Sequence, residues 1–212
     1  MRPRASRSLE NQARRDGFVH VAGVDEVGRG CLAGPVMAAA VILDPDRYVP
    51  GIADSKVLSA GARERLCDWI IEVAVAWRVA AVEVQEIDRV NIHHASLEAM
   101  RLAIMGLVPL PGFVFVDGFR VPKLPMAQRA VQGGDRQVTA IAAASIVAKV
   151  ARDRVMRDLH ARDPRYGFDQ HKGYATPAHL AAVARYGYSD VHRRSFRPRT
   201  LFDTTMFGTH GA

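Results

Sequence analysis

The sequence predicts an α/β domain with a largely helical C-terminal part. Short apolar runs typical of buried strands alternate along the chain with segments whose apolar residues recur at helical spacing. Neither an internal repeat nor a low-complexity linker divides the 212 residues, and a hydrophobic content of 49% suffices for one sizeable core. We therefore expect one domain over residues 18–200, preceded by a basic, disordered arm at residues 1–17 and followed by a tail at residues 201–212.

The strands are predicted from apolar runs. Residues 19–27 are mostly small or apolar and lead into a Gly-Arg-Gly turn, and residues 36–43 form a second run that stops at an Asp-Pro-Asp breaker. Residues 75–84 alternate in polarity as a half-buried strand does. Residues 113–116 form an all-apolar strand that delivers Asp117 to its end.

The helices are predicted from apolar stripes and capping residues. One stripe covers residues 60–73, and Asn91 can cap a second helix. A long helix is expected over residues 141–159. The pair Thr176-Pro177 is typical of an N-cap followed by the first helical position, so a short helix should begin there.

The composition favours an anionic partner. The formal charge is +7 and the sequence pI is about 9.9. Because arginines gather near both ends of the chain, we expect these ends to contact a nucleic-acid backbone; a solvated tail is the alternative for the first end. The arginines concerned are Arg2, Arg4, Arg7, Arg14, Arg15, Arg185, Arg193, Arg194, Arg197 and Arg199.

Other classes of protein are disfavoured. No apolar run approaches the ~20 residues that cross a bilayer. Residues 1–17 lack the apolar face of an organellar targeting peptide. Cys31 and Cys67 form no CxxC pair, which argues against a disulfide scaffold and a cysteine zinc site. We expect a monomeric, soluble, cytoplasmic protein with no membrane contact.

Carboxylates lie in segments that otherwise read as buried. Asp25 and Glu26 interrupt the first strand, where their burial is costly unless cations or hydrogen bonds compensate. Asp117 ends an apolar strand, and Asp135 follows two glycines. Such oxygen ligands suit Mg²⁺ or Mn²⁺ rather than zinc. A single aspartate could instead be a turn or cap residue, and for Asp135 the two interpretations are evenly balanced.

Two adjacent residues of a regular strand face opposite sides, so Asp25 and Glu26 can serve one site only if the strand bends. The glycines of the Gly-Arg-Gly turn at residues 28–30 permit such a bend. This turn is not a dinucleotide-binding loop, because its glycines continue as GxGxxxG and a strand-like run follows where a helix should begin. We expect the glycines to let the backbone approach a nucleic-acid strand; a plain tight turn is the alternative.

Together these motifs resemble those of bacterial type II ribonuclease H, over roughly residues 19–199. The resemblance rests on Gly23-Val24-Asp25-Glu26-Val27-Gly28-Arg29-Gly30, Asp54-Ser55-Lys56, Asp117-Gly118, Gly134-Asp135, Ala143-Ala144-Ser145-Ile146-Val147-Ala148-Lys149-Val150, His171-Lys172-Gly173-Tyr174-Ala175-Thr176 and His192-Arg193-Arg194-Ser195-Phe196. It implies a ribonuclease H-like fold, in which a mixed central sheet is flanked by helices and followed by a C-terminal helical segment, all within residues 18–200.

The resemblance also implies roles for particular residues. The catalytic residues and ligands of two Mg²⁺ or Mn²⁺ ions would be Asp25, Glu26, Asp117 and Asp135. Asp153 is a rival for the fourth position, but its place in a long helix beside arginines suits a surface ion pair better.

The implied substrate contacts fall in two groups. Gly28, Arg29 and Gly30 would read the 2′-hydroxyl of a ribonucleotide through their backbone, and Tyr174 would stack on the next sugar. Contacts to the strand or its phosphates are assigned to Lys56, Lys149 and Arg194. The sequence departs from the family at Val57, where a second lysine is frequent, and this could weaken one phosphate contact.

The activity implied by the resemblance is hydrolysis of the RNA strand of RNA/DNA hybrids, and of the 5′ side of single ribonucleotides embedded in duplex DNA, by a two-metal-ion mechanism. One alternative is another nuclease of the same fold, of the resolvase or transposase type, which would lack a ribose sensor. The other is a non-catalytic, basic nucleic-acid-binding module, in which clustered buried carboxylates would be a liability.

Overall fold

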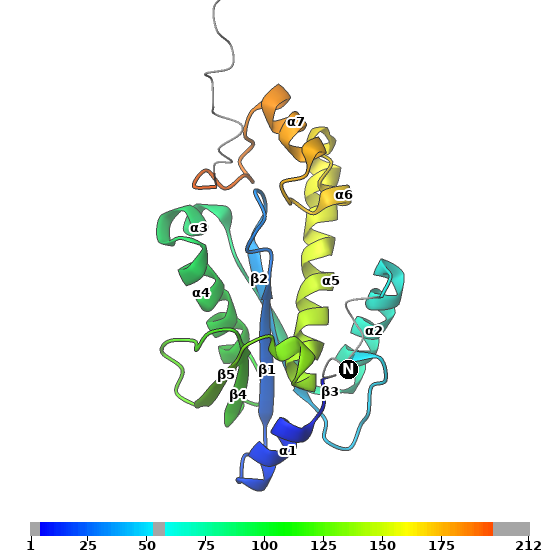
Figure 1. Cartoon of the computed structure of the whole chain (residues 1–212), viewed down its shortest axis with the longest axis vertical. Coiled ribbons are helices and arrows are strands. Elements are labelled where there is room, and N and C mark those ends of the chain that lie inside the picture. Colours follow the sequence, from blue (N-terminus) through cyan, green and yellow to red (C-terminus); the bar gives the residue numbers. More distant parts are fainter. Residues whose placement is uncertain (1–4, 53–57, 197–212) are drawn as a thin grey trace, which may run out of the picture.

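A computed structural model describes residues 5–52 and 58–196. One mixed sheet runs through its centre in the strand order β3-β2-β1-β4-β5 (Figure 1). Its antiparallel part consists of β1 (Val21–Val27), β2 (Val36–Leu43) and β3 (Ala74–Val82). Two further strands run parallel to β1, namely β4 (Phe113–Asp117) and β5 (Ala127–Val131). The predicted mixed central sheet is confirmed.

Helices cover both faces of the sheet (Figure 1). One face packs against α1 (Ser8–Arg15), α2 (Ala60–Val73) and α5 (Thr139–Arg162), and the other against α3 (Val84–Val90) and α4 (Ile92–Met105). Beyond the end of the sheet, α6 (Phe168–His171) and α7 (Pro177–Tyr186) follow α5 and form the predicted C-terminal helical segment. Among the described residues, no helix has the length and hydropathy needed to cross a membrane.

Most elements predicted from apolar patterns are present. The predicted strand at residues 36–43 and helix at residues 60–73 coincide with β2 and α2. The Asn91 side chain caps α4 by accepting hydrogen bonds from two backbone N–H groups. The elements that were not predicted include α1, the short helices α3 and α6, and β5, which is an edge strand whose residues are mostly partly or fully exposed.

The prediction of a disordered arm is wrong for residues 5–17. This segment contains α1, in which Glu10 is only 1% exposed. The Glu10 carboxylate accepts a hydrogen bond from the Ala140 N–H (2.9 Å) at the start of α5, whose own N-cap residue, Val138, has no side-chain acceptor. Helix α1 therefore supplies the cap that α5 lacks. The ends of the chain at residues 1–4 and 201–212 lie outside the described residues.

Replacing Glu10 with alanine should lower the free energy of unfolding by about 1–2 kcal/mol, because a buried N–H at the start of α5 loses its acceptor. Glutamine keeps an acceptor oxygen, so Glu10→Gln should lose less. The measurement is urea unfolding of both variants, with Glu72→Ala as the control at an exposed position of α2. Equal stability of the alanine variant and the wild type would show that α1 does not cap α5.

Candidate active site

Three carboxylates meet at one edge of the sheet. Asp25 and Glu26 lie on β1, Asp117 is the last residue of β4, and one oxygen of each lies within 4.8 Å of the others. The two strands are parallel neighbours, paired as far as Val24 opposite Val116. Their carboxyl ends therefore lie side by side, which brings together residues far apart in the sequence.

The bend predicted for β1 is not accompanied by a break in its pairing. Its pairing with β2 continues without a register shift to Val27, and the chain turns only at Gly28, where φ is 92°. The carboxylates of Asp25 and Glu26 nevertheless converge on Asp117. Asp25 and Glu26 therefore contribute to one site although the pairing of β1 stays regular.

The charges of this cluster are only partly compensated within the protein. Burial raises the pKa of Asp25 well above its usual range, and the charges of Asp117 and Glu26 raise it further. A hydrogen bond from Ser145 on α5 lowers this pKa, but by less than burial raises it. Burial also raises the pKa of Glu26, although Arg29 opposes this with a hydrogen bond at 3.3 Å. A site in which carboxylates are hard to ionise favours a bound cation, and its oxygen donors fit Mg²⁺ or Mn²⁺. The role of Ser145 was not predicted.

Asp135 lies beside this cluster but does not join it. Among the described residues, the group of carboxylates within 4.8 Å of one another contains only the three named above. Asp135 is in a 3-10 turn (Gly134–Arg136), with 12% of its side chain exposed and the Arg136 Nε 3.8 Å away. The same turn contacts the cluster, because the Gly134 N–H donates to the Asp117 carboxylate at 2.6 Å. Asp135 therefore lies in a turn that contacts the site, but its carboxylate is not within 4.8 Å of all three others.

The predicted phosphate-contacting residues have different surroundings. Lys149 donates to Asp153 at 2.6 Å, so Asp153 does form an ion pair, but with a lysine rather than a neighbouring arginine and with only 14% of its side chain exposed. Arg194 is exposed and its backbone N–H binds Asp88. Lys56 lies outside the described residues.

Arg193 was predicted to contact phosphates, and this is wrong. The residue is fully buried, and its guanidinium donates to the carbonyl oxygens of Arg29 and Gly34, both at 3.0 Å. A buried side chain cannot neutralise a phosphate on the surface. Arg197 and Arg199 of the same predicted set lie outside the described residues.

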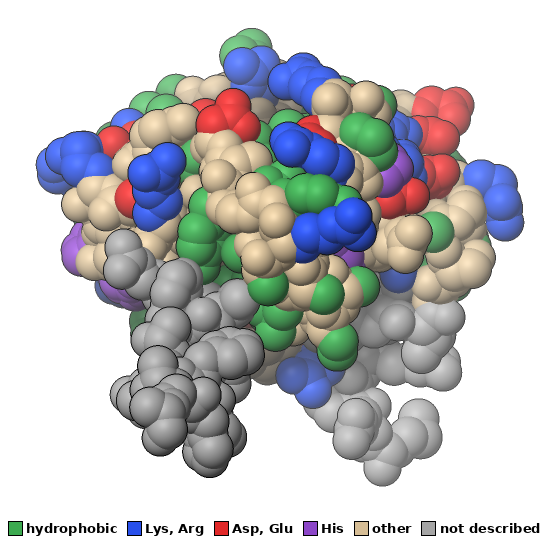
Figure 2. Space-filling model, turned by 90° about the horizontal axis from the view of Figure 1, so that it is seen from above, with side chains coloured by type: hydrophobic (Ala, Val, Ile, Leu, Met, Phe, Trp, Pro, Cys, Tyr) green, Lys and Arg blue, Asp and Glu red, His purple; other side chains and the backbone are tan. Residues whose placement is uncertain are grey.

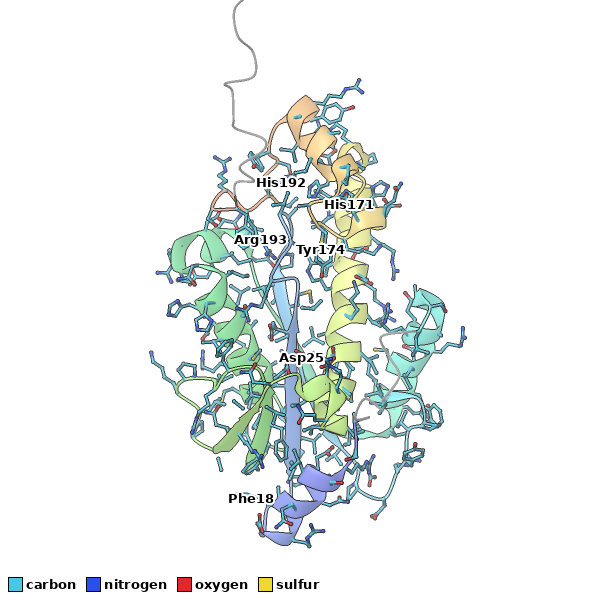
Figure 3. The ribbon with its side chains drawn as sticks, viewed as in Figure 1. Phe18, Asp25, His171, Tyr174, His192 and Arg193 are labelled. Carbon is cyan, nitrogen blue, oxygen red and sulfur yellow. The ribbon has the colours of Figure 1, made fainter. Side chains whose placement is uncertain are left out.

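The predicted Gly-Arg-Gly turn and Tyr174 lie side by side. The backbone of Cys31, next to the turn, forms an isolated antiparallel β-bridge with the backbone of Tyr174. The Leu32 N–H donates to the Gly173 carbonyl at 2.8 Å. The Tyr174 side chain is 43% exposed and lies above Asp25 (Figure 3). Burial raises the pKa of the Tyr174 phenol, so it stays protonated and can donate a hydrogen bond.

Two buried histidines support the Tyr174 backbone. The nitrogen His179 Nδ1 contacts the Tyr174 carbonyl (2.9 Å), and His179 Nε2 contacts His192 Nε2 (3.0 Å). A carbonyl only accepts, so Nδ1 of neutral His179 carries the proton and its Nε2 accepts from His192. His192 Nδ1 then accepts from the Ser189 N–H (3.0 Å). The chain of bonds requires both rings to be neutral.

Acid should therefore destabilise the protein. Burial lowers the pKa of His192 to about 4 from an ordinary 6.5, so between these values the unfolded chain binds a proton that the folded chain does not. The free energy of unfolding should fall by up to roughly 3 kcal/mol as the pH drops through this window. Urea unfolding at several pH values would measure it, with His94→Gln as an exposed control. Titration of His192 near pH 6.5 by NMR would contradict this prediction.

Comparisons with known proteins agree with this geometry. A family described as Ribonuclease HII matches residues 22–200. A Ribonuclease HII of Cupriavidus necator is 56% identical over 179 residues, 83% of this chain and 75% of that protein. One of Burkholderia mallei is 54% identical over 184 residues, 86% of each chain. The crystal structure of ribonuclease H2 from Pyrococcus horikoshii superimposes with a TM-score of 0.74 at 27% identity, covering 86% of this chain and 97% of that one. The chain therefore belongs to the ribonuclease HII family of metal-dependent endoribonucleases.

Proposed function

We propose that this ribonuclease H, besides cutting RNA paired with DNA, recognises single ribonucleotides within duplex DNA and cleaves on their 5′ side, leaving a 3′-hydroxyl and a 5′-phosphate. The observation that supports this is the position of the Gly28–Gly30 turn and Tyr174 at the same end of the sheet as the carboxylate cluster. Only the 2′-hydroxyl distinguishes RNA from DNA at one nucleotide, and it both donates and accepts. Backbone groups of a turn and a phenol can bond to it in both directions.

The carboxylates that would hold Mg²⁺ or Mn²⁺ are Asp25, Glu26 and Asp117, with Asp135 as the fourth ligand of a pair of ions. Two bound cations would supply water activation and stabilisation of the leaving oxygen. The protein orients the ligands: the Gly134 N–H holds Asp117, and the Ser145 hydroxyl holds Asp25.

Basic side chains would hold the rest of the duplex. Lysine and arginine side chains are spread over the upper end of the molecule, between apolar and acidic ones (Figure 2). Arg194, Lys149 and Lys56 would contact phosphates, although Lys149 would have to share its ammonium group with Asp153. A cytoplasmic location and a monomeric state stay predictions from the sequence.

The test is cleavage of three matched duplexes, one all-DNA, one with a single ribonucleotide and one an RNA/DNA hybrid, with and without Mg²⁺ or Mn²⁺. We expect metal-dependent cuts in the last two and none in the first. Cutting of the all-DNA duplex would favour a resolvase-like or transposase-like nuclease. Binding of all three without any product in the presence of metal would favour a non-catalytic module.

Tyr174→Ala and Tyr174→Phe should separate stacking from hydrogen bonding. Phenylalanine keeps the ring and loses one neutral hydrogen bond, so cleavage of the single-ribonucleotide duplex should fall about two- to tenfold. The alanine variant also loses stacking, which is worth roughly 1–3 kcal/mol for aromatic residues on nucleic acid. Its cleavage rate should therefore fall well below that of the phenylalanine variant. Melting temperatures are measured alongside the rates. An alanine variant with normal activity, or with a loss that only follows unfolding, would remove Tyr174 from substrate recognition.

A further inference from the structure

Two arginines are fully buried where the C-terminal helical segment meets the loop of residues 28–35, which joins β1 to β2. These are Arg152 on α5 and Arg193 beyond α7. Within residues 5–52 and 58–196, neither guanidinium forms an ion pair with a carboxylate. A buried cation without an anion is costly unless its N–H groups are bound. All three nitrogens of the Arg152 guanidinium have acceptors, as do Nε and Nη1 of Arg193, whereas Nη2 of Arg193 has none among the described residues.

Arg152 joins the two chain segments that carry the proposed ribose contacts. Its Nε and Nη2 donate to the carbonyls of Pro35 (3.1 Å) and Ala33 (3.0 Å) in the loop of residues 28–35. Its Nη1 donates to the carbonyl of Lys172 (2.9 Å), two residues before Tyr174. The planar, five-donor guanidinium can satisfy three carbonyls at fixed angles, which a lysine ammonium cannot do in the same geometry.

Arg193 holds the same loop from another side. Its side chain donates to the carbonyls of Arg29 and Gly34, both at 3.0 Å, and its backbone N–H donates to Leu32 at 2.8 Å. The guanidinium carbon also lies 5.2 Å from the centre of the Phe196 ring. The carbonyl of Arg29, the central residue of the Gly-Arg-Gly turn, is therefore held by the buried Arg193 side chain.

The glycines at residues 28 and 173 are packed so closely that neither has room for a side chain. A Cβ atom at Gly28 would lie 2.2 Å from Arg152 Nε, and one at Gly173 would lie 2.5 Å from the Ala33 carbonyl oxygen. A Cβ atom at Gly30 would meet nothing within 4 Å. The loop is therefore tightly packed where Gly28 meets Arg152, whereas Gly30 has free space beside its backbone. A substrate could approach the backbone at Gly30.

We infer that Arg152 and Arg193 are positioning residues for ribonucleotide recognition, which hold the backbone of residues 28–35 in register with Tyr174 without touching the substrate. The inference rests on the proposed function for the identity of the ligand. Backbone recognition of one hydroxyl tolerates displacements of only about 0.5 Å. A loop between two strands keeps that accuracy only if its carbonyls are fixed by the surrounding structure, and four of those carbonyls bind these two guanidinium groups.

The test uses Arg152→Lys and Arg193→Lys, which keep the charge and lose the planar fork. Matched controls are Arg157→Lys, on the same helix as Arg152, and Arg165→Lys, in the C-terminal segment; both replace exposed arginines in surface ion pairs. Three quantities are measured below the melting temperature of each variant: amide hydrogen exchange, Mn²⁺ affinity, and kcat on the single-ribonucleotide duplex.

In both test variants, we expect exchange in peptides covering residues 28–35 and 171–176 to be about tenfold faster or more, the effect of losing one or two buried hydrogen bonds. The kcat should fall by about tenfold or more, because misplacement by about 1 Å at a recognition group is costly. Exchange in β1 and Mn²⁺ affinity should stay within about twofold of the wild type, since Asp117 and Asp25 are held by Gly134 and Ser145, outside the loop. The control variants should match the wild type in all three measurements.

The inference would be overturned if both test variants had the amide exchange rates and the kcat of the wild type. So would losses of kcat that parallel losses of Mn²⁺ affinity and faster exchange throughout the chain, because these would indicate general destabilisation. If Arg152→Lys does not fold, Arg193→Lys decides by the same criteria. A wild-type protein that does not cut the single-ribonucleotide duplex would refute the proposed function, whereas local exchange changes in the variants would still support the fixing of the loop by the two arginines.

Discussion

Replacing Asp117 with asparagine is expected to reduce metal-dependent cleavage by at least about a thousandfold, because the site loses one charge of the cluster that binds the cation. The change is nearly isosteric. Asparagine can still accept the hydrogen bond from the Gly134 N–H, so the turn that carries Asp135 should keep its place. The measurement is the cleavage rate on the single-ribonucleotide duplex at saturating Mg²⁺ or Mn²⁺.

The stability of the same variant provides the control. The charge of Asp117 helps to raise the pKa of Asp25, so its removal relieves repulsion in the metal-free protein. The melting temperature without metal should therefore equal or exceed that of the wild type, and the stabilisation by added Mn²⁺ should decrease. Activity within about tenfold of the wild type at saturating metal would exclude Asp117 as an essential ligand.

Alanine at the two glycines of the Gly-Arg-Gly turn should give opposite results. At Gly28, φ is 92° and a Cβ atom would collide with Arg152, so Gly28→Ala should lower the free energy of unfolding by at least about 2 kcal/mol. At Gly30 there is open space, and Gly30→Ala should change stability by less than about 0.5 kcal/mol. The new methyl group would nevertheless lie where the backbone approaches the substrate, so cleavage should fall by about tenfold or more.

Urea unfolding and cleavage of the single-ribonucleotide duplex, measured on both variants, separate these effects. A Gly30→Ala variant that cuts like the wild type would show that the substrate does not approach the turn closely. The glycines would then serve only a tight turn, which is the alternative that the sequence leaves open. A stable Gly28→Ala variant would show that the loop can move away from Arg152.

The carboxylate cluster could be predicted because its residues carry a local signal. Asp25 and Asp117 each follow an apolar run typical of a buried strand, and a carboxylate there is costly without a partner. The adjacency of β1 and β4 has no such signal, since it depends on the order of strands in the sheet. Asp135 has a weaker signal, because aspartate after two glycines is common in ordinary turns.

The buried arginines could not be predicted from local patterns. Arginine is seldom fully buried, and the loop carbonyls that these two bind lie 117 to 164 residues away in the sequence. For Arg152 one signal exists: it lies four residues from Ala148 and four from Met156, both buried on α5, so its helix position faces inward. Glu10 was missed for a similar reason, since its acceptor role depends on a contact 130 residues away.

The contact between Arg193 and Arg29 also limits the order in which the protein can assemble. A pairing across 164 residues forms late, because the chain must first lose the entropy of closing so large a loop. During synthesis, β1 and the loop that follows it leave the ribosome long before residue 193 does. Asp25, Glu26 and Asp117, together with the Gly134 and Ser145 groups that hold two of them, need only the part of the chain that ends with α5. In a growing chain, the carboxylate cluster can therefore assemble before the neighbouring loop has its final shape.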